Sequence, residues 1–450
     1  MVGRTQEQIR VGFVSLGCPK NTVDSERMLA TLAQSGMVIT AEPDNADVVV
    51  INTCGFIAPA KAESIEAIRQ AVGWKRGGAV KKVIAAGCLS ERMGERLFRE
   101  VEGIDAVIGL DGRDSIAQII KETLSGRNGV VYCGGARRRA SDIVLDDRTR
   151  LLITPGHWAY LRISEGCNHR CSFCTIPSIR GRFRSKPKEL VLAEARELAH
   201  AGAVELNLIG QDTSYYGRDL KERGGLAELL RELEKIAGLS WIRLMYLHPS
   251  GVDEQLIEAV AESEKVVPYF DIPIQHISDR VLKAMRRGQS RRKIEALLDR
   301  LRRSVPGAML RTTLIAGFPG ETDEEFEELV EFVRWAKFDA LGCFAYSREA
   351  GTEAAALPNQ LSEQAKQERV EAVMLAQQQV AFAKNAERIG SELRCLVDYA
   401  DTNTVRGRFY GQAPEIDGVC YIEKCSGKPG HFVETRVVGT KDYDLLVEQV

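Results

Sequence analysis

Hydrophobic and polar positions along the first 125 residues alternate in a way that predicts short buried strands separated by amphipathic helices. Apolar runs predict strands at residues 11–16, 48–51, 83–86 and 106–108. Between the second and third runs, Ile65, Ile68 and Val72 share one face of a predicted helix. Strand–helix alternation of this kind is typical of a parallel sheet with right-handed crossovers. We therefore predict an α/β domain with a parallel sheet over residues 10–125.

The pattern dissolves over residues 126–156, which carry glycines and the run Arg137-Arg138-Arg139, and there we predict a linker. Alternation then resumes, with candidate strands at 158–163, 204–209, 241–247, 269–274, 309–316 and 339–345. Each precedes a helical stretch, and residues 361–389 form one long helical pattern. Successive βα units without the eight of a complete barrel predict a partial (β/α)6 TIM-like barrel over residues 157–383.

Short β-type runs with glycine-rich turns occupy the end of the chain, and they predict a small all-β barrel over residues 384–450. The fold class is therefore α/β multidomain, with a parallel α/β sheet domain, a partial barrel and a small β-barrel in that order.

Composition limits the class of protein. The 450 residues include 61 basic and 63 acidic side chains and are 44% hydrophobic, which excludes extensive disorder. A net charge of −2 excludes gross basicity as the means of holding nucleic acid. No apolar stretch approaches the roughly 18 residues that span a bilayer, and the N-terminal sequence lacks the apolar core of a signal peptide. We expect a cytoplasmic protein.

Eleven cysteines in a reducing compartment favour metal ligation or redox chemistry over disulfides. The strongest signal is Cys167-x-x-x-Cys171-x-x-Cys174, because closely spaced thiolates in one loop are typical ligands of an iron–sulfur cluster. Three ligands for four irons leave one iron open. A structural zinc site is the alternative, and it requires a fourth ligand, for which His169 is a candidate.

A second set of cysteines is spread along the first domain. Cys18, Cys54 and Cys88 each lie just past the end of a predicted strand, and each has a glycine neighbour. Because the carboxyl ends of parallel strands share one edge, the three thiols are expected to converge there. Glycine lets the backbone approach a bulky cluster closely. We interpret the set as a second three-thiolate site; the alternative is three buried cysteines in small-residue turns.

A run of cations and two histidines each allow a functional and a structural interpretation. Six cations and no acid lie between residues 167 and 188, which indicates either a positively charged entrance that attracts an anionic substrate or an RNA backbone, or a solvated loop and helix start. His248 and His276 near predicted strand ends are either proton relays or hydrogen-bonded structural histidines. We expect structural roles for the remaining cysteines, Cys133, Cys343, Cys395, Cys420 and Cys425.

The three-cysteine loop, with aromatic Phe173 before its last cysteine, resembles the radical S-adenosylmethionine (SAM) superfamily. The resemblance implies that the open iron of a 4Fe–4S cluster binds SAM. One electron then cleaves SAM to a 5′-deoxyadenosyl radical that abstracts an unactivated hydrogen. It also suggests Phe173 as a residue of the SAM site.

Two three-cysteine sites followed by a small β-barrel resemble the methylthiotransferase family across nearly the whole chain. Its architecture implies a methylthiotransferase N-terminal domain, a radical SAM core and a C-terminal TRAM domain. Cys18, Cys54 and Cys88 match the ligands of the family's auxiliary 4Fe–4S cluster, which is thought to present or supply sulfur. The SAM-binding cluster is matched by Cys167, Cys171 and Cys174. The resemblance implies a second SAM as methyl donor.

Segments such as SLGCPKNTVDSE, INTCGFI and ISEGCNHRCSFC resemble the branch of the family that modifies an aspartate β-carbon in small-subunit ribosomal protein twelve. Residues 390–450 carry seven Lys or Arg and ten Asp or Glu, a net charge that suits a basic ribosomal protein better than RNA. An electron donor protein and a sulfur donor are expected partners. The alternatives are a tRNA methylthiotransferase acting on an adenosine beside the anticodon and a non-catalytic iron–sulfur binding protein.

Overall fold

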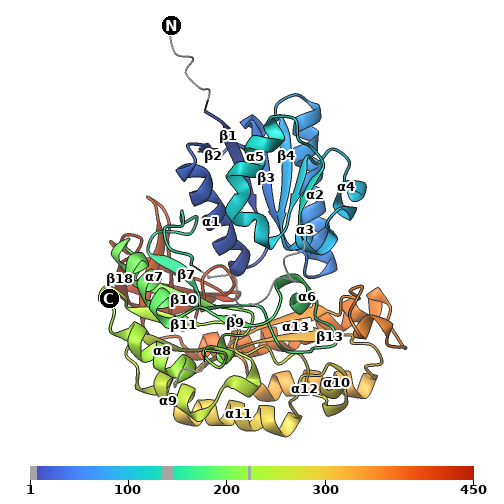
Figure 1. Cartoon of the computed structure of the whole chain (residues 1–450). Helices are drawn as coiled ribbons and strands as arrows, with labels where there is room; N and C mark the ends of the chain where they lie inside the picture. The colour runs from blue at the N-terminus through green and yellow to red at the C-terminus, as the bar shows by residue number, and fades with distance from the viewer. Residues whose placement is uncertain (1–7, 134–145, 221–223) are drawn as a thin grey trace. The chain divides into compact units, whose positions relative to one another are not determined.

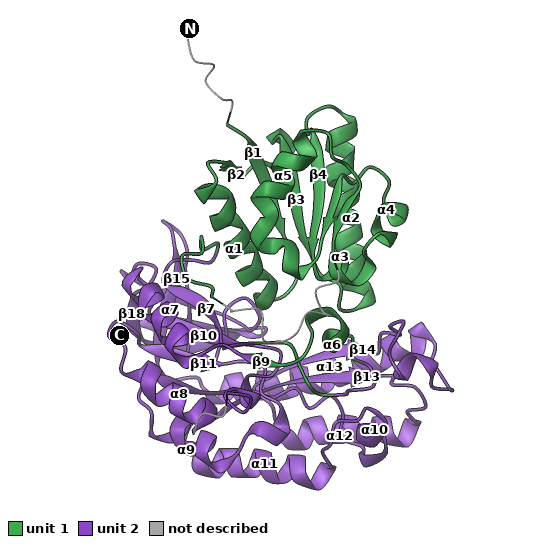
Figure 2. Cartoon of the chain, in the orientation of Figure 1, with its two compact units in different colours: residues 1–153, 165–169, 174–184 green, residues 154–164, 170–173, 185–450 purple. Residues whose placement is uncertain are grey.

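The computed structural model describes residues 8–133, 146–220 and 224–450 (Figure 1). The run Arg137-Arg138-Arg139 lies outside the described residues. The chain divides into two compact units (Figure 2). The first contains residues 1–153, 165–169 and 174–184, and the second contains residues 154–164, 170–173 and 185–450.

The first unit is built on a parallel sheet. Its strands are β1 (Arg10–Ser15), β2 (Val38–Thr40), β3 (Val48–Thr53), β4 (Lys82–Gly87), β5 (Ala106–Ile108) and β6 (Val130–Tyr132). They lie in the order β2-β1-β3-β4-β5-β6. The strand order reverses between β1 and β3, so this is the topological switch point, where ligands of such sheets bind beyond the carboxyl ends of the strands.

Helices cover both faces of this sheet. They are α1 (Pro19–Gln34), α2 (Ala58–Arg76), α3 (Cys88–Met93), α4 (Arg96–Glu100) and α5 (Ile116–Leu124), with α6 (Ile176–Arg180) joining from later in the chain. Successive residues of β3 divide between the two cores: Val48 and Val50 pack with α1 and α5, whereas Val49 and Ile51 pack with α2. This explains why β3 is a continuous apolar run.

The sequence pattern did not predict β2 and β6. Both are short edge strands and only partly buried, so neither has the uninterrupted apolar run of a strand with helices on both faces. β6 pairs with β5 inside the range for which we predicted a linker, so the sheet extends beyond residue 125.

The second unit contains the predicted βα units. Its parallel strands are β7 (Trp158–Arg162), β10 (Glu205–Ile209), β11 (Trp241–Leu244), β12 (Val266–Asp271), β13 (Met309–Ala316) and β14 (Ala340–Ala345). They form one sheet in the order β14-β13-β12-β11-β10-β7. The helices are α7 (Lys188–His200), α8 (Gly225–Glu234), α9 (Glu254–Glu262), α10 (Asp279–Ala284), α11 (Arg291–Ser304), α12 (Asp323–Ala336) and α13 (Glu363–Glu387). The partial-barrel prediction is confirmed.

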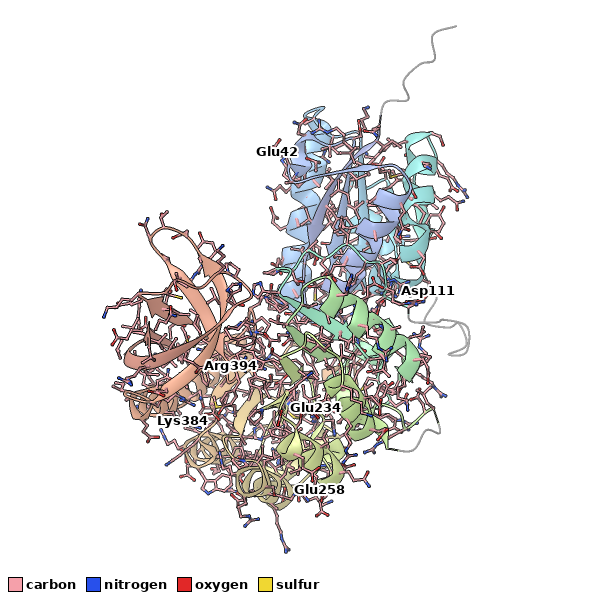
Figure 3. All side chains as sticks on the ribbon, turned by 90° about the vertical axis from the view of Figure 1, so that its left-hand side faces the viewer. Glu42, Asp111, Glu234, Glu258, Lys384 and Arg394 are labelled. Atoms are coloured by element: carbon pink, nitrogen blue, oxygen red, sulfur yellow. The ribbon has the colours of Figure 1, made fainter. Side chains whose placement is uncertain are left out.

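The end of the second unit is a closed antiparallel-rich barrel in the order β15-β16-β17-β19-β18, as predicted. Its strands are β15 (Glu392–Ala400), β16 (Val405–Phe409), β17 (Cys420–Glu423), β18 (Phe432–Lys441) and β19 (Asp444–Gln449). Figure 3 shows charged side chains on the outside of this unit, among them Arg394 on β15 and Glu258 on α9. Within the described residues, no helix is both long enough and apolar enough to span a bilayer.

Candidate cluster-binding site

The three cysteines of the first domain lie at the carboxyl ends of three neighbouring strands. Cys18 is the N-cap residue of α1 after β1, Cys54 directly follows β3, and Cys88 directly follows β4 as the first residue of α3. β1, β3 and β4 are adjacent in the sheet, so all three cysteines lie at the switch-point edge.

Glycines let these segments approach one another closely. A Cβ atom added to Gly17 would lie 3.0 Å from Cys54 Cβ and 3.4 Å from its Sγ. At Gly55 an added Cβ would lie 2.9 Å from the carbonyl carbon of Cys88, which no side chain permits. Gly17 and Gly87 also have φ values of +98° and +94°. The expected convergence of the three cysteine segments is therefore present.

Burial raises the pKa of two of these thiols, Cys54 and Cys88. Desolvation raises the pKa of Cys88 to about 12, and Arg180 acts in the opposite direction. Desolvation is also the largest cause of the raised pKa of Cys54, and the nearby Cys18 adds to both shifts. The raised pKa values keep Cys54 and Cys88 protonated at neutral pH on their own, so metal binding would release protons from these two thiols.

Asn21 and Arg180 surround the Cys88 sulfur. Cys88 Sγ donates to Asn21 Oδ1 at 3.4 Å, and Arg180 Nη2 lies 3.2 Å from the same sulfur. Asn21 Nδ2 in turn donates to the carbonyls of Leu16 and Thr53, at 3.0 and 2.9 Å. Asn21 thereby ties the ends of β1 and β3 to the sulfur that follows β4.

The second cysteine set occupies one loop between β8 (Ser164–Glu165) and α6. All three cysteines are half-buried. The backbone N–H of His169 donates to Cys167 Sγ, and that of Ile176 donates to Cys174 Sγ, each at 3.4 Å. N–H donors to sulfur favour thiolate ligands and tune a cluster bound to them.

The middle of this loop packs within the second unit. Arg287 Nη1 donates to Cys171 Sγ at 3.4 Å, and its Nη2 donates to the Pro273 carbonyl at 2.6 Å. Phe173, the residue suggested for the SAM site, packs against a hydrophobic cluster that contains Met285 and Phe318.

In the described part of the chain, no three Cys, His, Asp or Glu side chains meet in an arrangement for a single metal ion. A closed zinc shell that includes His169 would have that arrangement. The thiolates of a 4Fe–4S cluster bind different irons and need not converge on one point. Donor sets made of thiols alone are the kind that hold iron–sulfur clusters, and the described residues show no closed shell for a zinc ion.

The run of cations between residues 167 and 188 fits neither an open positively charged entrance nor a solvated loop throughout, because two of the six are buried in ion pairs. Arg180 pairs with Asp24 and Glu165, and Lys186, which is fully buried, pairs with Glu194. No local sequence signal distinguishes Arg180 from the exposed cations near it, so the sequence did not identify it as part of a site. Arg287 was missed for the same reason.

The two candidate histidines are hydrogen-bonded. His248 Nδ1 lies 2.7 Å from Ser250 Oγ. His276 Nδ1 accepts the backbone N–H of Ser278 at 3.1 Å, and its Nε2 lies 3.3 Å from the Glu321 carboxylate, which also accepts the N–H of Gly317. These contacts favour the structural alternative for both.

Comparisons with known proteins agree with this architecture. Residues 161–333 match the radical SAM superfamily, residues 10–109 match the uncharacterized protein family UPF0004, and residues 389–450 match the TRAM domain. Among solved structures, the radical SAM methyltransferase TsrM from Kitasatospora setae covers 75% of this chain and 73% of its own, with a TM-score of 0.55 and 18% identity. The cobalamin-dependent SAM radical enzyme OxsB covers 83% and 56%, with a TM-score of 0.51 and 14% identity. These two show the fold alone.

Sequence relatives match along nearly the whole chain. The ribosomal protein uS12 methylthiotransferase RimO of Geobacter sulfurreducens is 45% identical over 443 residues, 98% of each chain. The protein of the same name from Thermoanaerobacter sp. is 44% identical over 441 residues, 97% of this chain and 99% of its own. The chain therefore belongs to the RimO family of ribosomal protein uS12 methylthiotransferases.

Proposed function

We propose that the protein replaces a β-hydrogen of an aspartyl residue in ribosomal protein uS12 with a methylthio group, using SAM and two 4Fe–4S clusters. The observation that carries the proposal is the presence of two three-thiol sets in one chain of the RimO family. The proposed ligands are Cys18, Cys54 and Cys88 for the auxiliary cluster and Cys167, Cys171 and Cys174 for the SAM-binding cluster.

The protein's contribution is to hold each cofactor in a defined environment. When bound, the second cluster would supply the electron that cleaves SAM to a 5′-deoxyadenosyl radical. Backbone N–H groups of His169 and Ile176 stabilise the thiolates of Cys167 and Cys174. We assign Phe173 to the SAM site because it lies in the same loop and carries an apolar ring. Cys88 is buried and Cys54 is half-buried, so part of the auxiliary site is shielded from water.

The charge of the C-terminal barrel supports a protein substrate. Residues 390–450 have three more acidic than basic side chains, whereas phosphate binding requires cations. A net negative charge in this domain favours association with a basic ribosomal protein. We expect an electron donor protein and a sulfur donor as further partners. A ribosomal substrate implies that the reaction takes place in the cytoplasm. The net charge of the C-terminal barrel does not favour the tRNA-modifying alternative.

The deciding experiment is mass spectrometry of one anaerobic reaction. It contains reconstituted enzyme, SAM, reductant, sulfide, protein uS12 and hypomodified tRNA together. We expect a methylthio-for-hydrogen gain on an aspartyl peptide of uS12 alone. The same gain on a tRNA nucleoside, with uS12 unchanged, would refute the proposed substrate.

Removal of one cysteine is expected to affect SAM cleavage differently in the two cysteine sets. Cys171→Ala should abolish both SAM cleavage and methylthiolation, because the cluster that binds SAM loses a ligand. Cys54→Ala should retain some SAM cleavage but form no methylthiolated product. Cys425→Ala, in the C-terminal barrel, serves as the matched control and should behave like the parent. Both 5′-deoxyadenosine and modified peptide are quantified; full product from Cys54→Ala would overturn the auxiliary-site assignment.

A further inference from the structure

Arg180 is a buried guanidinium at the end of α6 that the proposed reaction does not yet use. Its side chain is 2% exposed. Nη1 donates to Glu165 at 2.9 Å, while Nη2 contacts Asn21 Oδ1 at 2.6 Å, Asp24 Oδ2 at 3.0 Å and Cys88 Sγ at 3.2 Å. The guanidinium is therefore held from several sides, with one nitrogen against the sulfur.

The packing of α6 fixes this position. Ile179, next to Arg180, packs with Cys88 and Leu110 in one hydrophobic cluster. The helix begins two residues after Cys174, so the segment that follows the SAM-cluster loop reaches the auxiliary set within the first unit. A long cationic side chain buried in this way can neither move into solvent nor lose its proton.

Arg180 belongs to a buried group of charges that includes a second arginine. Arg180 and Arg113 face Asp24 and Glu165, two cations against two carboxylates. A cluster on Cys88 brings further negative charge into this buried site. Cys88 Sγ then accepts a hydrogen bond from Arg180 Nη2. The reduction potential of an iron–sulfur cluster rises when hydrogen-bond donors and positive charge lie beside its sulfur atoms.

We propose that Arg180 is a positioning residue that raises the reduction potential of the auxiliary cluster through its N–H contact with the Cys88 sulfur. This inference rests on the proposed function, since it assumes that Cys18, Cys54 and Cys88 hold a cluster. It assigns a role in that site to a residue from the segment that follows Cys174. The reduced auxiliary cluster is stabilised because its added electron lies near a fixed, desolvated cation.

The test isolates the auxiliary cluster in the full-length chain. A parent with Cys167, Cys171 and Cys174 all changed to alanine retains only the first cysteine set. Iron and sulfide content shows whether it holds a cluster, and a redox titration followed by electron paramagnetic resonance gives the midpoint potential. Neither readout depends on methylthiolation.

Three further changes are made in this parent. Arg180→Gln/Glu165→Gln removes the guanidinium together with one carboxylate partner, so that Glu165 is not left charged and buried; Asp24 keeps Arg113. Glu165→Gln alone is its reference. Arg113→Gln is the matched control, because Arg113 also contacts Asp24 but no contact joins it to a cysteine among those described.

We expect the double variant to bind its cluster and to favour the oxidised form about tenfold over Glu165→Gln, which corresponds to about 59 mV for one electron. Arg113→Gln should titrate with the parent. Equal potentials in the double variant and its reference, or an equal shift in Arg113→Gln, would overturn the role of Arg180. A parent that binds no iron would instead refute the auxiliary site itself. Arg180→Lys retains the positive charge but lacks the planar guanidinium with its several N–H donors. This variant should lower the midpoint potential of the auxiliary cluster by less than the double variant does.

Discussion

At the residue scale, the auxiliary site depends on glycines as much as on thiols. Gly87 precedes Cys88 at φ +94°, and an added Cβ would lie 2.2 Å from Asn52 Oδ1 and 2.8 Å from the Thr53 carbonyl. The sequence predicted this need for glycine beside each cysteine. It did not predict Arg180 or Asn21, because their contacts with Cys88 join residues far apart in the chain.

Gly87→Ala is expected to destabilise the protein and weaken iron binding. The positive φ and the contact with backbone atoms together cost about 2–5 kcal/mol of unfolding free energy. Gly73→Ala is the matched control: Gly73 lies in α2 with nothing within 4 Å of an added Cβ, so alanine should raise stability by about 0.5–1 kcal/mol. Thermal unfolding and iron content measure both. Equal behaviour of the two variants would contradict the steric explanation.

At the element scale, helix α12 illustrates how a local motif acquires tertiary partners. Thr322 and Glu325 form a capping box at its N-terminus. The Glu325 carboxylate also accepts a hydrogen bond from Ser278 Oγ at 2.9 Å and one from Arg280 Nε at 2.7 Å. The cap therefore fixes α10 to α12 as well as beginning the helix.

Thr322→Ala should destabilise this helix start by about 1 kcal/mol, whereas Thr322→Ser keeps the hydroxyl and should cost little.

Burial acts to raise the pKa of Glu325, but hydrogen bonds from Arg280, the Thr322 backbone and Ser278 lower it to about 2. Because the folded pKa lies below the ordinary 4.5, the stabilisation is complete above pH 4.5 and is lost as the pH falls toward 2. Hydrogen exchange of α12 amides at neutral pH and at pH 3 measures both effects; protection that is independent of pH would contradict this assignment.

At the scale of the whole chain, the C-terminal barrel contacts the parallel strands of the same unit through buried charges. Arg408 on β16 pairs with Glu205 on β10 at 2.8 Å and with Asp398 on β15 at 2.7 Å. His157 lies 2.9 Å from Asp398. Burial acts to raise the pKa of Glu205, but Arg408 and then Arg243 lower it, so the carboxylate remains charged.

Arg408→Met should cost about 3–5 kcal/mol, because it leaves buried carboxylates short of a partner. The loss should appear as a lower unfolding temperature and faster hydrogen exchange in β10 and β16. Arg436→Met in the same barrel removes an exposed pair with Glu392 and should cost less than about 1 kcal/mol. If both variants unfold alike, the buried network does not hold the barrel to the strands.

The sequence alone determined the fold class, the order of the domains and the two cysteine sets. These follow from local information: apolar periodicity reports burial, and the spacing of cysteines along a parallel α/β pattern places them at one sheet edge. It identified neither the edge strands β2 and β6 nor the burial of Arg180 and Lys186 within a cationic run. The tertiary structure decided which arginine meets the Cys88 sulfur and which charges join the C-terminal barrel to its neighbours. A buried ion pair is set by which distant segments pack together, and no local pattern carries that information.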